Sequence, residues 1–249
     1  MICATALDAL PEVSAGDDLI ALLADVLPSD AGGREDVLVL AHKVVSKAEG
    51  RTRRLSEVVP GARALDLAAR LRKDPRHVQV VLDESAELRR AEHGVLIAVT
   101  HHGFVCANAG VDASNTPDDD TLIMLPVDPD RSARKIRAGL RAHRGKAPAV
   151  LITDSFGRAW RHGQVDVAIG AAGLAALEDW RGRGDGRGRE LRATLIAAAD
   201  QLAAAADLAR AKNAMQPAVL VTGAGRHVTD DDGPGVAPLL RGPGEDLFR

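Results

Sequence analysis

The sequence predicts an α+β fold, with mixed and antiparallel sheets packed against helices. Short continuous apolar runs are typical of buried strands, and segments with helical spacing and favourable end residues stand between them. The two kinds of segment do not follow one another in the steady alternation of a doubly wound sheet. At 249 residues, the chain can form one large domain or two small ones that share an interface. We therefore expect a single domain over 1–249, with room for two subdomains.

The chain is expected to begin with a helix and then a strand. Asp17 and Asp18 precede an apolar segment, and acids in that place predict a capped helix over 19–25. The apolar run 37–41 predicts a buried strand. The segment that follows, 43–51, becomes polar and contains a glycine near its end.

Two more helices and a hairpin are expected before the middle of the chain. The first of these helices covers 62–71. Asp74 and Pro75 suit the cap and first turn of the other, which we expect to continue to about Leu88. Apolar runs at 94–100 and 104–107 flank a polar turn and predict the hairpin.

The second half of the chain adds two helices and two strands. Asp130 precedes a basic helix over 132–143, and the apolar run 147–153 predicts a buried strand that ends at Asp154. The later segments are a loop rich in glycine and arginine, an alanine-rich helix and a final strand, at 181–189, 191–208 and 217–221.

The composition excludes several classes of protein. The net charge is -3, aromatic residues make up 2% and tyrosine is absent, so we expect no nucleic-acid partner. No apolar run approaches the roughly 20 residues of a membrane span, and the N-terminus lacks a basic leader. The two cysteines, Cys3 and Cys106, form neither a metal-binding set nor a disulfide framework. We expect a cytoplasmic protein with no membrane partner.

Two common nucleotide-binding motifs are ruled out. The run from Val219 to Arg226 begins like a dinucleotide fingerprint, but the later glycines are missing and too few residues follow it. No Gly-rich P-loop sequence is present. Any nucleotide must therefore bind by another route.

Three segments place polar residues beside apolar strands. Lys47 follows the strand at 37–41 and could meet phosphate, although most such lysines are solvated. Asp112 lies among small residues in 108–115 and offers an oxygen ligand for Mg²⁺ or Mn²⁺; taken alone, this segment is more typical of an Asx-rich turn.

The third segment is 152–161. Asp154 and Ser155 follow a predicted strand, where ligand sites tend to lie, and Arg158 and Arg161 could bind a phosphate or carboxylate. Two acids, a hydroxyl, a lysine and two arginines suit metal-assisted phosphoryl transfer better than acid–base hydrolysis.

Several segments together resemble the signature segments of the coenzyme F420-0:L-glutamate ligase family. The similarity runs in order from Leu10 to Arg249. It is carried by residues 46–51, 106–115, 153–158, 166–170, 179–182, 188–191 and 245–249.

The resemblance implies a reaction and an assembly. It implies GTP-dependent transfer of the γ-phosphoryl group to the terminal carboxylate of the deazaflavin F420-0, followed by attack of the L-glutamate amine; further glutamates would be γ-linked. It implies Mg²⁺ or Mn²⁺, a potassium requirement, and a homodimer of an unusual α+β ligase fold with two intertwined subdomains. In some relatives a reductase-like domain is fused behind the ligase, and we expect none here.

The resemblance also suggests roles for individual residues. Asp112, Asp154 and Ser155 correspond to divalent-metal ligands, and Asp112, Asp154 and Lys47 are our candidate catalytic residues. Arg158 and Arg161 are our own candidates for binding the tail of the acceptor. The expected GTP contacts are Leu10, Pro11, Glu12, Val13, His42, Lys47, Asn115, Lys212 and Asn213.

Two of these positions depart from the family pattern. His42 stands where archaeal members carry serine beside GTP. The loop 210–216 is usually glycine-rich; here Lys212 and Asn213 are the substitutes that we expect.

Two alternatives remain. A related enzyme could join an amino acid to a different phosphorylated acid; it would keep Lys47, Asp112 and Asp154 and differ near Arg158 and Arg161. The altered 210–216 loop also leaves open a nucleotide-sensing module without catalysis.

Overall fold

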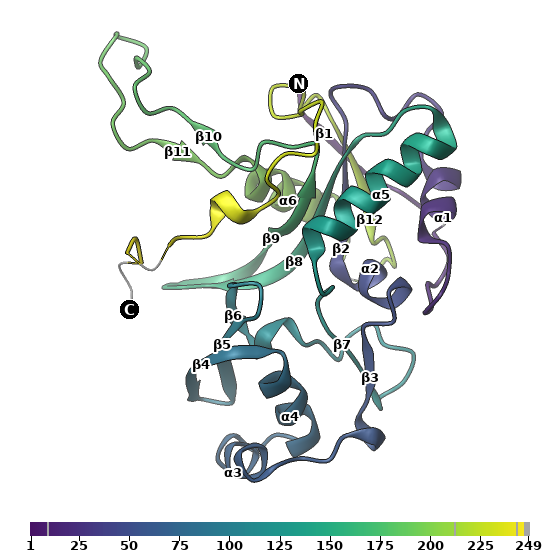
Figure 1. The fold of residues 1–249 in the computed structure, drawn as a ribbon, viewed down its shortest axis with the longest axis vertical. Helices are drawn as coiled ribbons and strands as arrows, with labels where there is room; N and C mark the ends of the chain where they lie inside the picture. The colour runs from purple at the N-terminus through teal and green to yellow at the C-terminus, as the bar shows by residue number, and fades with distance from the viewer. Residues whose placement is uncertain (9, 212, 243, 247–249) are drawn as a thin grey trace.

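A mixed five-stranded sheet forms the centre of the larger part of the molecule (Figure 1). The computed structural model describes residues 1–8, 10–211, 213–242 and 244–246. Strands β2 and β8 run parallel, and the other neighbouring pairs run antiparallel. In spatial order, the strands are β1 (Cys3–Ala6), β12 (Ala218–Thr222), β2 (Val37–Ala41), β8 (Ala149–Arg158) and β9 (Arg161–Ala172).

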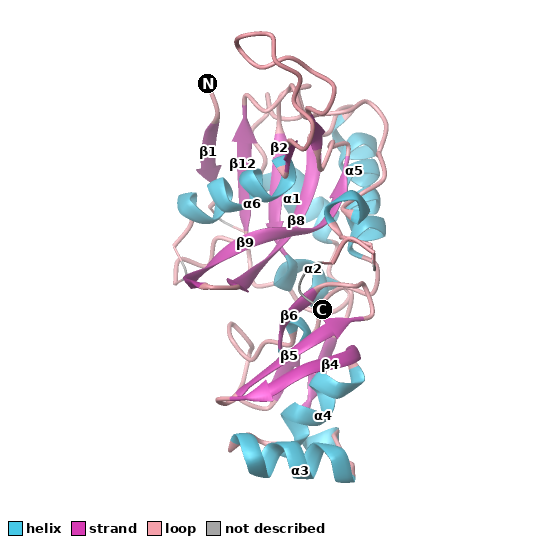
Figure 2. Ribbon diagram, turned by 90° about the vertical axis from the view of Figure 1, so that its left-hand side faces the viewer, coloured by secondary structure: helices cyan, strands magenta, loops and turns pink. Residues whose placement is uncertain are grey.

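Helices cover both faces of this sheet, which explains why β2 and β12 are apolar along their length. Helix α5 (Pro129–Arg144) packs on β8 and β9 together with α1 (Leu19–Val26), while α6 (Ala198–Ala209) lies on the opposite face (Figures 1 and 2). Glycine is needed at position 139, because a Cβ there would lie 2.5 Å from Ile20 Cδ1. Close contact between α5 and α1 therefore depends on this glycine.

A second hydrophobic cluster lies below the main sheet in Figure 2 and is built from residues between 52 and 124. Leu96 and Val78 belong to it and are fully buried. The helices are α3 (Ala62–Leu71) and α4 (Pro75–Asp83), and short 3-10 turns occur at Leu55–Glu57 and Asn108–Gly110. The strands are β3 (Thr52–Arg54), β7 (Thr121–Ile123), β4 (Ser85–Glu92), β5 (Val95–Thr100) and β6 (Val105–Ala107).

Helix α2 (His42–Ala48) follows β2 without a connecting loop and lies between the two clusters (Figure 2). A long arm carrying β10 (Glu178–Asp179) and β11 (Leu195–Ile196) projects from the larger part (Figure 1). A last 3-10 turn spans Ala237–Leu239. Within the described residues, no helix combines the length and the apolar character that a membrane crossing requires.

The mixed α+β class is confirmed, and most of the expected elements are present. The intertwined subdomains and the homodimer stay predictions. The alanine-rich helix begins at Ala198 rather than 191, because 195–196 pairs with 178–179 to form the arm. The basic helix begins at Pro129 rather than 132 and is capped by Asp128, so Asp130 lies in its first turn instead of preceding it.

The structure also corrects the helix expected to reach Leu88. It ends at Asp83, and 85–92 forms β4, which pairs with β5 across two register irregularities. The run from Glu87 to Glu92 is mostly polar and has no apolar alternation that would indicate a strand. Pairing with the apolar strand β5 outweighs the low strand preference of these polar residues. Strands β1, β3, β7, β9, β10 and β11 were not expected either.

Candidate active site

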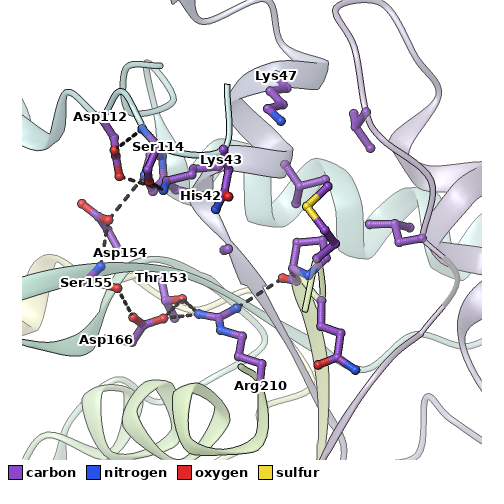
Figure 3. A pocket seen from close by; sticks show the side chains of 18 of the residues that line it. His42, Lys43, Lys47, Asp112, Ser114, Thr153, Asp154, Ser155, Asp166 and Arg210 are labelled. Carbon is purple, nitrogen blue, oxygen red and sulfur yellow. Dashed lines mark hydrogen bonds and ion pairs between the residues drawn. The ribbon is translucent and has the colours of Figure 1, made fainter. Parts of the chain in front are cut away.

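A cavity of about 400 Å³ opens beside the start of α2, at the junction of the main sheet and the second cluster (Figure 3). Many of the residues predicted from the sequence line it. They are Leu10, Pro11, Glu12, Val13, His42, Lys47, Asp112, Asn115, Asp154 and Ser155.

The parallel pair β2 and β8 determines where the cavity forms. Ala41, the last residue of β2, pairs with Thr153. Helix α2 begins at the next residue, whereas β8 continues to Arg158 in a hairpin with β9. The expectation that the strand ends at Asp154 is therefore wrong, since polar residues continue the strand to Arg158 after its parallel neighbour has stopped. The site still lies at the carboxyl end of β2, where ligands of parallel strands are commonly bound.

Asp154 is held from the side of the main sheet. His42 Nε2 lies 3.4 Å from its Oδ1, and the backbone N–H of Ser155 donates to the same oxygen at 2.8 Å. Burial raises the pKa of Asp154, but His42 and the Ser155 amide outweigh burial, so the net pKa lies below its ordinary value. The group is therefore a carboxylate at neutral pH.

Asp112 lies on the side of the second cluster, just after a strained turn. Asn108, Ala109 and Gly110 all have left-handed backbone, with φ of 51°, 53° and 72°. Such conformations are costly for residues other than glycine and are often found at functional sites. Beyond the turn, Asp112 exchanges two backbone hydrogen bonds with Ile123, which fixes it against β7.

Lys43 neutralises Asp112. Its Nζ lies 2.7 Å from Asp112 Oδ2 and donates to Ser114 Oγ at 2.5 Å. The Ser114 amide donates to Asp112 Oδ1 at 2.6 Å. Burial raises the pKa of Asp112, yet the Lys43 hydrogen bond and charge lower it more, so the net pKa is below normal. The negative charge of Asp112 in turn acts to raise the pKa of Asp154, because the two carboxylates repel each other.

Lys47 faces the cavity from the last turn of α2. Its side chain is 11% exposed, and its ammonium pairs with the carboxylate of Glu12, which is itself half-exposed. A lysine that is buried on its stem and paired at its tip can exchange partners when a more strongly charged group arrives. Asn115 also lines the cavity and has a left-handed backbone, at φ 55°.

Sequence reasoning missed several residues that line the cavity, most notably Asp166 and Arg210. Asp166 of β9 is 1% exposed and accepts hydrogen bonds from Ser155 Oγ at 2.6 Å and Thr153 Oγ1 at 2.8 Å. Arg210 follows α6 and forms an ion pair with Asp166 (Figure 3). One signal was present in the sequence, because Asp166 is a single acid inside the apolar run 165–172.

The other missed residues show a simpler pattern. Most of them lie within two positions of residues that were predicted or belong to the loop before β12, and Gln164 lies on β9. They are Ala41, Lys43, Val44, Ser114, Thr153, Gln164, Ala211, Met215, Gln216 and Pro217.

The structure does not bring every predicted residue to the cavity. Arg158 and Arg161 are exposed on the outer part of the β8–β9 hairpin, where Arg158 Nη2 donates to the His162 carbonyl at 2.6 Å. Asn213 is exposed in the turn after α6 and does not line the cavity. Lys212 lies outside the described residues. The proposed roles of all these residues stay predictions.

The acids of the cavity are compatible with a divalent cation that is bound together with phosphates. Among the described residues, no three His, Cys, Asp or Glu side chains converge as a complete metal site. Mg²⁺ commonly takes one or two protein carboxylates and completes its shell with water and substrate phosphates. Asp112 and Asp154, with the hydroxyl of Ser155, match that pattern.

Comparison with known proteins gives matches along nearly the whole chain. The family model described as F420-0:gamma-glutamyl ligase matches residues 9–223. A coenzyme F420:L-glutamate ligase of Methanothermobacter thermautotrophicus is 44% identical over 246 residues, covering 98% of this chain and 97% of the relative. Proteins of the same name from Methanopyrus kandleri and Haloarcula marismortui are 45% and 42% identical, over 96% and 98% of this chain and 94% of each relative.

Proposed function

The chain belongs to the F420-0:gamma-glutamyl ligase family, and from that premise we propose that it joins L-glutamate to coenzyme F420-0 at the expense of GTP. The γ-phosphoryl group of GTP passes to the terminal carboxylate of the deazaflavin tail, giving GDP and an acyl phosphate. The amine of L-glutamate attacks the acyl carbon, and phosphate leaves as the amide bond forms. Further γ-linked additions follow the same course.

The observation that carries this proposal is that Asp112 and Asp154 line the same cavity as Lys47. Asp154 lies on the part of the fold built on the first hydrophobic cluster, and Asp112 lies on the part built on the second. The fold therefore brings together two negative charges that are far apart in the sequence. Such a gathering is costly unless cations offset it, as Lys43 partly does. A site for a phosphorylated nucleotide and its cation gives a physical reason for the arrangement.

Each residue has a distinct task in this proposal. Asp112, Asp154 and Ser155 would hold Mg²⁺ or Mn²⁺, which supplies charge neutralisation for phosphoryl transfer when bound. Lys47 exchanges Glu12 for a nucleotide phosphate, and Leu10 to Val13 provide the neighbouring contacts.

The direct test is a reaction containing GTP, Mn²⁺, L-glutamate and F420-0, followed by mass spectrometry. We expect a product heavier by one glutamyl unit, together with GDP and phosphate. Nucleotide binding without turnover would instead favour a sensing module. Turnover with another phosphorylated acid, but not with F420-0, would favour the related ligase.

Lys47→Ala tests the nucleotide part of the proposal. Because a charge-assisted hydrogen bond is lost, we expect GTP affinity to fall by about 10-fold or more. Lys135→Ala, at an exposed position on α5, is the matched control and should leave affinity unchanged. Equal GTP affinities in both variants would remove Lys47 from the site.

Two further properties are proposed from the family alone, namely potassium dependence and a homodimer. Replacing KCl with NaCl at constant ionic strength should slow the reaction. Sedimentation should give twice the mass of one chain. Equal rates in the two salts, or a monomer at assay concentration, would contradict the corresponding property.

A further inference from the structure

One buried acid in the cavity has no role in the reaction proposed above. Asp166 is 1% exposed, although it lies on a strand whose outer residues are open to solvent. Its side chain points toward Ser155 and Thr153 of the neighbouring strand (Figure 3). A carboxylate in such a place requires compensation, because burying an unpaired charge is strongly unfavourable.

Arg210 provides the compensating charge. Its Nη2 pairs with Asp166 Oδ2 and also donates to Thr153 Oγ1 at 3.2 Å. Its Nη1 donates to the carbonyl of Pro217 at 3.3 Å, just before β12. The Arg210 side chain is 9% exposed. The pair therefore links β8, β9, the end of α6 and the start of β12 beneath the cavity.

The hydrogen bond from Ser155 determines what this pair can do. A serine hydroxyl has one hydrogen, and here Ser155 Oγ donates it to Asp166 Oδ1 at 2.6 Å. The hydroxyl is thereby held in one rotamer at the wall of the cavity. An oxygen ligand whose hydrogen is engaged elsewhere presents its lone-pair side to a cation, and such supporting contacts tune metal affinity.

Asp166 is poorly placed to bind a cation itself. Both of its oxygens accept hydrogen bonds within the protein, and the guanidinium of Arg210 lies against it. A divalent ion at Asp166 would face the repulsion of that fixed positive charge.

We propose that Asp166, held by Arg210, is a positioning residue that fixes the Ser155 hydroxyl as an oxygen ligand for the divalent cation. This inference rests on the proposed function, since it assumes that Ser155 binds the cation. It assigns to Asp166 and Arg210 a role that acts through another side chain.

The test is a double-mutant cycle on Mn²⁺ affinity, measured by electron paramagnetic resonance with and without GDP. In Asp166→Asn, one oxygen becomes an amide nitrogen, so the fixed acceptor for Ser155 is weakened without a change in volume. We expect Mn²⁺ affinity to fall about 10-fold, the scale of second-layer ligand contacts. In a Ser155→Ala background, the same change should have no further effect. An undiminished effect of Asp166→Asn in that background would overturn the proposal.

Asp200→Asn is the matched control for removing a partly buried acid beside the same strand. Asp200 accepts the backbone N–H of Ala168 at 2.9 Å and does not line the cavity. Mn²⁺ affinity should be unchanged in this variant, whatever its effect on melting temperature. A loss equal to that of Asp166→Asn would mean that affinity only follows stability, and the proposal would fail.

Arg210→Gln keeps the inference testable if Asp166→Asn does not fold. Positioning predicts weaker Mn²⁺ binding, because Asp166 is held less firmly, and the loss should vanish with Ser155→Ala. Stronger binding would show that Asp166 becomes a ligand once the guanidinium is gone, contrary to the proposal.

Asp154→Asn distinguishes a failure of the proposed function from a failure of the positioning role. If the wild-type protein binds no Mn²⁺, or if Asp154→Asn binds it normally, the proposed function itself is contradicted. If Asp154→Asn loses Mn²⁺ while Asp166→Asn keeps wild-type affinity, only the positioning role fails.

Discussion

The two acids of the cavity reach it by different structural means. Asp154 lies in the middle of a ten-residue strand that is paired on the main sheet, and its side chain is 14% exposed. Asp112 lies on a loop after three left-handed residues, and its side chain is 36% exposed. A nearly buried histidine faces the first acid, and a flexible lysine faces the second.

This difference indicates a division of labour. The sheet presents Asp154 in nearly one position, because its backbone is held by β9 and its oxygen by His42. The position of Asp112 depends on how the second cluster packs and on a turn that stores strain. We infer that Asp154 is the preorganised half of the site and that Asp112 is the half that perturbations of the second cluster can displace.

The largest expected effect is that of Asp154→Asn. Removing charge from the preorganised half should lower kcat/KM for ligation by at least about 100-fold, the scale of losing one electrostatic contact at a transition state. The volume is nearly unchanged, so the melting temperature should move little. Asp119→Asn, an exposed acid in the loop after Asp112, is the control and should behave as wild type.

Asp112→Asn should have a smaller effect than Asp154→Asn, about 10-fold to 100-fold on kcat/KM, because Lys43 then has no carboxylate to neutralise and stays near the phosphates. Both variants are assayed under the same conditions with Mn²⁺ in excess. An effect equal to or larger than that of Asp154→Asn would break the proposed division between the two acids.

Gly110→Ala tests whether the turn governs the second half of the site. Gly110 has φ 72°, and an added Cβ would lie 2.7 Å from Leu125 Cγ. We expect a loss of about 1–3 kcal/mol in the free energy of unfolding, from backbone strain and overpacking together. Urea unfolding gives the stability, and a ligation assay gives the effect on the site.

Gly94→Ala isolates the backbone part of this effect. Gly94 has φ 75°, but nothing lies within 4 Å of an added Cβ. It should lose less stability than Gly110→Ala and keep its activity. If the two variants lost activity equally, the turn before Asp112 would have no special role.

The prediction from sequence was most successful where local and tertiary preferences agree. The strands at 37–41 and 218–222 are buried on both faces, so their apolar runs were unambiguous. It was wrong at 85–92, whose mostly polar residues form a strand because β5 lies beside them. Asp112 and Asp154 were paired by resemblance, whereas the Asp166–Arg210 pair joins residues 44 apart, a contact that spacing alone cannot indicate.

Lys43→Met should change the pH dependence of Mn²⁺ binding through the pKa of Asp112. The Asp112 pKa is lowered by Lys43 against the opposing effect of burial, so its folded pKa lies below its unfolded one. Its ionisation therefore stabilises the fold above the unfolded pKa, and this contribution is lost as the pH falls through the folded pKa. In Lys43→Met, burial is unopposed by the lysine and the pKa rises, so Mn²⁺ binding should weaken at a higher pH than in wild type. If Mn²⁺ affinity fell at the same acidic pH in Lys43→Met as in wild type, Lys43 would not set the pKa of Asp112.

The smallest expected effect uses Cys106 of β6 as a reporter of the preorganised acid. Burial, and then the charge of Asp154, raises the pKa of this thiol from 9.0 to about 12, whereas Cys3 is exposed. In Cys3→Ser, the remaining thiol should react with a disulfide reagent at least about 10-fold more slowly than an open one, because thiolate is the reacting form and the higher nucleophilicity of a high-pKa thiolate offsets only part of its scarcity. Adding Asp154→Asn removes a neighbouring negative charge, so the Cys106 pKa should fall and the reaction should quicken at alkaline pH.

Adding Asp112→Asn instead should leave the rate unchanged, since Asp112 does not contribute to this shift. Equal rates in the two double variants would mean that Asp154 affects the Cys106 pKa no more than Asp112 does, contrary to this prediction.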